Sequence, residues 1–360
     1  MSRKRNKGER SRPKRLLLIA LPIAIVLGVV GYNLSRNSAR TLANIRELGR
    51  RDPAAAREVL EASNIRSRDA QLLRCQFLAT AGNWKQAEDA FEEISQPEFC
   101  RQNELIELAS TALASGIYSL ADKVLSAAYR GDSEDVQLLR TMIDVKHELA
   151  AGQEVIELCR EMSRLAPRDP YPWLRAAQIY QQAEKIDLAI EAYQEVLARD
   201  PEDRIAQNAR FQIADLAIYA GELNTARQQL DQLLREMPDA PGVGVLYAKL
   251  LHREGDSAAG VRILNGVLAS TPDFLSALLE RGVLYLELED SAAAVRDLDQ
   301  VVKLDPENYT GHYQLGLAYQ RLNQPDLAGR HFERSRQITE QVSEQKLQHQ
   351  RNSPSSASAQ

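Results

Sequence analysis

The sequence predicts an all-α protein in which antiparallel helix pairs repeat along most of the chain and stack into a solenoid. Ala, Leu, Gln, Glu and Arg dominate the body, and these residues favour helices over strands. A small residue near the start of each second helix recurs at steps of 34 residues, with a single step of 37. It falls at Ala87, Ala121, Val155, Ala189, Ala226, Gly260, Ala294 and Ala328.

The clearest unit runs from Pro170 to Pro201 and reads as two amphipathic helices joined by a tight turn. Ala177 marks the packed face of its first helix, and Ala189 marks that of the second. Pro201 ends the unit, because proline cannot donate the backbone hydrogen bond of a helix interior. Prolines close several further units in the same phase, at Pro167, Pro238, Pro272 and Pro306.

The N-terminus predicts a basic leader, residues 1–15, followed by a transmembrane helix, residues 16–32. The leader carries eight Lys and Arg residues against Glu9 alone, a net charge of +7. Because the whole chain has a net charge of −5, the remaining residues carry −5 − 7 = −12. Residues 16–32 contain no charged side chain. As a helix they would span roughly 26 Å, slightly less than the thickness of the hydrocarbon core of a bilayer. Basic flanks stay in the cytoplasm, which predicts a signal-anchor with an extracytoplasmic body, periplasmic in a bacterium.

Cleavage of this segment as a secretory signal peptide is the alternative, and it predicts a secreted protein. The apolar run is longer than the usual core of a signal peptide, and no clear small-x-small cleavage site follows it. These two features favour the uncleaved anchor.

The repeats predict a body over residues 39–342, with eight to nine units. A degenerate first unit fits residues 39–66, where Leu42, Ile45 and Leu48 form one apolar stripe. The three-residue excess lies near Glu202–Ala206, between units, and predicts a local change in stacking angle. Glycines at Gly82, Gly116, Gly221 and Gly255 predict tight turns within helix pairs. Residues 343–360 are predicted to form a polar, disordered tail. The polar run at residues 339–352, which overlaps its start, reads as an extension of the last helix, and residues 353–360 read as disordered.

A period of 34 residues with these spacings resembles the tetratricopeptide repeat (TPR) family, over roughly residues 39–340. The best matches are residues 170–203, 275–308 and 309–342. In the last two, Gly282 and Gly316 occupy the small-residue position of the first helix. Ile143 departs from that position, and Lys146 departs from the aromatic position one turn later.

The resemblance implies a right-handed superhelix with a concave groove, lined mainly by first helices, that holds a protein or peptide partner. The positions facing this groove would be Arg140, Asp144, His147, Gln178, Gln181, Asp215, Tyr219, Lys249 and His252. Tyr219 is the best aromatic anchor among them. The Lys and Asn pair that clamps chaperone C-termini in one subfamily is replaced here by Leu72 and Gln76, which disfavours that role.

Chemistry-bearing motifs are missing from the sequence. It contains no phosphate-binding loop, no zinc-protease motif and no nucleophile elbow. Cys75 and Cys159 fall on packing positions, and Cys100, near a junction between units, is the cysteine to test for reactivity. We therefore expect no enzyme activity, no cofactor, no metal site and no small-molecule substrate, and the acidic body argues against nucleic acid.

The leading hypothesis is a membrane-anchored scaffold that mediates protein–protein interaction outside the cytoplasm. The alternative is a noncatalytic regulatory or assembly subunit of a membrane enzyme or export complex. A stable, stoichiometric enzyme among the captured partners would favour the alternative.

Overall fold

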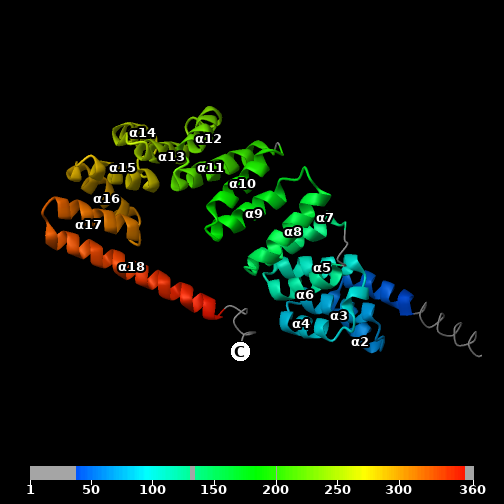
Figure 1. Ribbon diagram of the computed structural model, residues 1–360. Helices are drawn as coiled ribbons and strands as arrows, with labels where there is room; N and C mark the ends of the chain where they lie inside the picture. The colour runs from blue at the N-terminus through cyan, green and yellow to red at the C-terminus, as the bar shows by residue number, and fades with distance from the viewer. Residues whose placement is uncertain (1–37, 130–133, 200, 353–360) are drawn as a thin grey trace, which may run out of the picture. The chain divides into compact units, whose positions relative to one another are not determined.

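Paired α-helices make up the regular structure of the computed structural model, which describes residues 38–129, 134–199 and 201–352 (Figure 1). Those residues contain no β-strand. The chain divides into two compact units, Met1–Leu165 (unit 1) and Ala166–Gln360 (unit 2), each with its own hydrophobic core.

The described part of unit 1 starts with a helix over residues 38–49. It continues with α2 (Pro53–Ala62), α3 (Arg68–Thr80), α4 (Trp84–Glu92), the short 3-10 helix η1 (Pro97–Phe99), α5 (Gln102–Ala114), α6 (Tyr118–Ala128), α7 (Val136–Glu148) and α8 (Gly152–Leu165). Unit 2 contains α9 (Tyr171–Gln182), α10 (Ile186–Leu197), α11 (Asp203–Ala220), α12 (Leu223–Glu236), α13 (Pro241–Arg253), α14 (Ser257–Ser270), α15 (Leu275–Glu287), α16 (Ser291–Leu304), α17 (Tyr309–Arg321) and α18 (Pro325–Asn352).

The helix pairs fall in the predicted phase, so the prediction of an all-α repeat solenoid is confirmed. In each pair from α3–α4 to α17–α18, the predicted small residue lies near the start of the second helix. Ala121, Ala189 and Ala226 are completely buried there. Close packing also explains the glycines of the first helices, since a Cβ on Gly316 would come within 2.7 Å of the Phe332 ring.

The turns within the pairs from α3–α4 to α17–α18 share one backbone conformation. Each has a residue with positive φ at the same repeat position, namely Gly82, Gly116, Ala150, Glu184, Gly221, Gly255, Glu289 and Asn323. The next N–H bonds back to a carbonyl five residues earlier, as from Asp290 N to Tyr285 O at 2.8 Å, which is the Schellman helix ending. The four predicted glycine turns are therefore confirmed, and four non-glycine residues adopt the same conformation.

Helix α11 corrects the position of the three-residue excess. We expected these residues to lie between units, but Asp203 and Ala206 are already helical and α11 is 18 residues long. The excess adds about one turn to the start of α11, because Ala206 and Ala209 bury their side chains there. At the other end of unit 2, α18 runs to Asn352 and includes the first part of the predicted tail.

The expected leader and anchor, residues 1–15 and 16–32, lie outside the described residues, as do residues 353–360. Within the part of the chain that the structure describes, no helix combines the length and the apolar character needed to cross a membrane.

Candidate functional site

The candidate site is a cavity of about 330 Å³ in unit 2, here called the Tyr219 pocket, formed by the first helices of three successive repeats. Its lining consists of Asp215, Ile218 and Tyr219 from α11, Lys249, His252 and Arg253 from α13, and Glu280 and Val283 from α15. Residues three and four apart share one face of a helix, so each helix presents neighbouring side chains to the same space.

Tyr219 is the most exposed large apolar side chain among the described residues, with 73% of its surface accessible. It lies two residues before Gly221, the C-cap residue at which α11 ends in a left-handed turn. An aromatic ring left in solvent beside a cavity offers apolar area that a partner can cover.

The charged side chains of the pocket differ in how they are satisfied. Lys249 Nζ lies 3.7 Å from Asp215 Oδ1, and both side chains are partly exposed, so the pair contributes at most about 1 kcal/mol. His252 Nδ1 hydrogen-bonds to the Ser257 hydroxyl at 2.9 Å, which fixes the orientation of the ring. Burial raises the pKa of Glu280, although the nearby Lys249 and His252 charges partly oppose this.

Four of the nine predicted groove residues line this pocket: Asp215, Tyr219, Lys249 and His252. Gln178 and Gln181, also in unit 2, form local contacts instead. The Gln178 amide oxygen accepts a hydrogen bond from Arg175 at 3.1 Å, and Gln181 contacts both Gln212 and the Tyr193 hydroxyl. That these residues bind a partner stays a prediction.

The other three predicted residues, Arg140, Asp144 and His147, lie on α7 in unit 1. His147 is partly buried, and its Nδ1 has no hydrogen-bond partner among the residues that the structure describes. Lys146, the residue just before His147, replaces the usual aromatic residue and forms ion pairs with Asp122 at 2.9 Å and Glu154 at 2.6 Å. Lys146, which departs from the repeat pattern in the sequence, therefore links α6, α7 and α8 through these ion pairs.

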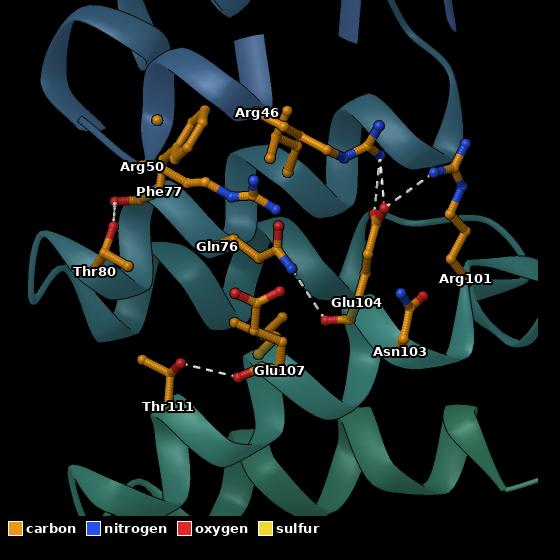
Figure 2. A pocket seen from close by; sticks show the side chains of 13 residues that line it. Arg46, Arg50, Gln76, Phe77, Thr80, Arg101, Asn103, Glu104, Glu107 and Thr111 are labelled. Atoms are coloured by element: carbon orange, nitrogen blue, oxygen red, sulfur yellow. Dashed lines mark hydrogen bonds and ion pairs between the residues drawn. The ribbon is translucent and has the colours of Figure 1, made fainter. Parts of the chain in front are cut away.

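A second cavity, of about 400 Å³, lies in unit 1 among the helix over residues 38–49, α3 and α5 (Figure 2). Glu104 is only 7% exposed at its edge. The Arg46 guanidinium donates to both Glu104 carboxylate oxygens, at 2.9 and 3.0 Å, and Arg101 approaches one of them at 3.5 Å. Gln76 donates to the Glu104 backbone carbonyl at 3.0 Å. The buried Glu104 carboxylate of this cavity is thus paired with arginines of the same lining.

Sequence reasoning missed Glu280 and Arg253 in the Tyr219 pocket and the Arg46–Glu104 pair in unit 1. Arg253 follows Lys249 by four residues, so helical spacing alone could have found it. Glu280 sits on α15, whose groove-facing side the sequence analysis left unassigned. Its partial burial depends on neighbouring repeats, which a single-repeat pattern does not contain.

The cysteine predicted to be worth testing for reactivity is buried. Cys100 is 1% exposed, and burial raises the pKa of its thiol, so the reactive thiolate is disfavoured. Cys100 is therefore a poor candidate for a reactive thiol, because its position at a repeat junction packs it inside unit 1. Cys75 and Cys159 are buried as expected.

Two segments of the chain match models described as tetratricopeptide repeat, at residues 171–203 and 279–342. These matches support the tetratricopeptide repeat family. No curated protein matches the sequence. Proteins of this repeat family are generally non-catalytic scaffolds.

A solved tetratricopeptide repeat protein from Parabacteroides merdae ATCC 43184 shares the fold with a TM-score of 0.58 at 19% identity, covering 66% of this chain and 93% of its own. The Cut9–Hcn1 hetero-tetramer of the APC/C gives a TM-score of 0.48 at 15% identity, covering 77% of this chain and 61% of its own. MamA from Desulfovibrio magneticus RS-1 gives 0.39 at 18% identity, covering 48% and 96%.

Proposed function

We propose that this chain is a membrane-anchored scaffold that binds a protein partner through the Tyr219 pocket, on the extracytoplasmic side. The observation that carries the proposal is the convergence of four predicted groove residues on one cavity, with an exposed aromatic ring at its edge. A repeat array of paired helices offers such cavities without further loops or domains.

The anchored location is supported by the sequence of residues 1–32. A leader of net +7 precedes an uncharged run of 17 residues, which orients the leader toward the cytoplasm and the body away from it. Reporter fusions after Gln360, combined with protease protection of the same chain, test this orientation. A body protected inside the cytoplasm would remove this part of the proposal.

Partner capture from native membranes tests the binding role. The full chain is compared with Tyr219→Ala and with Leu188→Ala, which removes an exposed apolar side chain of α10 outside the pocket. We expect the Tyr219 variant to lose a partner that the Leu188 variant retains. Equal capture by both variants contradicts the assignment of the pocket, and a stoichiometric enzyme among the partners favours a noncatalytic subunit of that enzyme.

A further inference from the structure

Glu280 is the acidic group of the Tyr219 pocket that has no direct ion pair, although the charges of Lys249 and His252 act on it from a distance. Its carboxylate makes no hydrogen bond and no ion pair with any residue that the structure describes. Lys249, whose charge lowers the pKa of Glu280, already lies against Asp215. A partly buried carboxylate without a partner is unfavourable, so a ligand that supplies a donor gains more here than at a solvated site.

The remaining cation of the lining, Arg253, does not create an equivalent demand for an anion. Its side chain is exposed, and water satisfies an exposed guanidinium at little cost. An anionic ligand would also meet the unpaired Glu280 charge inside the same cavity. The pocket therefore favours a cationic group over an anionic one.

Tyr219 adds a second feature that suits a lysine or arginine. A cation placed over a tyrosine ring gains about 0.5–1 kcal/mol at an exposed site, and the apolar stem of the same side chain covers the ring. With 73% of its surface accessible, the ring is available for this contact. The body of the chain is also acidic, carrying −12 outside the leader, which attracts basic segments over a distance.

We propose that the Tyr219 pocket receives a lysine or arginine side chain of a partner peptide, with its charged head against Glu280 and its stem on Tyr219. This inference rests on the proposed function, because it specifies the chemistry of the partner at the same pocket. The partner is therefore a protein with a basic segment exposed on its surface.

Binding of labelled peptide pools to the full chain tests the inference. The pools are acetylated and amidated hexapeptides in which one central position holds Arg, Lys, norleucine or Glu, among otherwise neutral residues. We expect fluorescence anisotropy to give about ten-fold tighter binding of the Arg and Lys pools than of the norleucine pool, the amount that one charge-assisted hydrogen bond supplies.

Two variants separate Glu280 from the general charge of the chain. Glu280→Gln keeps the size of the side chain and removes a charge that has no partner, so the fold is retained. Glu191→Gln is the matched control, because Glu191 is exposed on α10 and is not part of the pocket. We expect the preference for Arg and Lys to fall below two-fold in Glu280→Gln and to stay at about ten-fold in Glu191→Gln.

Three outcomes overturn the inference: no preference for Arg and Lys in the wild-type chain, the same preference in Glu280→Gln, or no binding of any pool. Equal binding of the norleucine and Arg pools that is lost in Tyr219→Ala overturns the cationic specificity but leaves the pocket as a binding site. Loss of partner capture in Tyr219→Ala together with failure of the cationic preference would thus separate the two proposals.

Discussion

The left-handed turns within the repeats give a direct test of how the chain fits its fold. Glu289 has φ of 60° in the turn between α15 and α16, at the position where Gly221 has φ of 84° between α11 and α12. Both residues precede an N–H that closes a Schellman ending. The test replaces Glu289 by glycine in one turn, Glu289→Gly, and Gly221 by alanine in the other, Gly221→Ala.

The magnitude follows from two opposing contributions. A residue with a Cβ loses roughly 1–2 kcal/mol in the left-handed region, and glycine removes that cost. Glycine also gains freedom in the unfolded chain, which offsets roughly 0.4–1 kcal/mol. Glu289→Gly should therefore stabilise unit 2 by about 0.5–1 kcal/mol. Gly221→Ala should destabilise it by a similar amount, since a Cβ there meets no atom within 4 Å and only the backbone conformation is at stake.

Urea denaturation followed by circular dichroism measures both changes at one temperature. Asn323→Gly is the control, because asparagine tolerates the left-handed region and should gain only a few tenths of a kcal/mol. If Glu289→Gly destabilises the chain, or if Asn323→Gly gains as much as Glu289→Gly, the conformational account of the turns is refuted.

Three further predictions concern packing and charge in unit 2. Asp297→Ala removes the counter-charge of the Arg281 guanidinium, which donates to both Asp297 carboxylate oxygens at 2.7 Å. The change should lower the free energy of unfolding in urea by about 2 kcal/mol, less than for a fully buried pair because Arg281 stays partly exposed. An unchanged free energy of unfolding would contradict this. Gly260→Ala places a Cβ 2.7 Å from Leu284 and 3.2 Å from the Ala248 carbonyl oxygen. This overpacking should lower the free energy of unfolding by about 1–3 kcal/mol. Unchanged stability would show that α13 and α14 can move apart. Because burial raises the pKa of Glu280 in the folded chain, its charge opposes folding above the unfolded pKa and not below it. Glu280→Gln should thus raise the melting temperature at neutral pH and leave it unchanged near pH 4, about the ordinary pKa of a glutamate. An equal change in melting temperature at both pH values would show that the burial of the Glu280 charge is not the cause.

The sequence predicted the repeats well because their cause is local. A small residue where two helices approach closely recurs at each period, and Ala121, Ala189 and Ala226 are completely buried as that reasoning requires. The turn at Glu289 was missed because its residue type does not indicate positive φ. Its position in the period does, since the other pairs from α3–α4 to α17–α18 turn at the equivalent residue.

The candidate site was predictable only in part. Helical spacing placed Asp215, Lys249 and His252 on first helices, and these residues meet at one cavity. The unpaired carboxylate of Glu280 depends on which side chains the neighbouring repeats bring near it. Cys100 shows the same limit, because tertiary packing buries a position that looked like a junction in the sequence.

Photo-crosslinking in native membranes tests the binding role of the Tyr219 pocket most directly. A benzoylphenylalanine replaces Tyr219 in one full-length chain, and it replaces Leu188, an exposed residue of α10, in a second. The account predicts that the probe at position 219 crosslinks a discrete protein and that the probe at position 188 does not. A crosslink only from position 188, or equally from both positions, would contradict partner binding through this pocket.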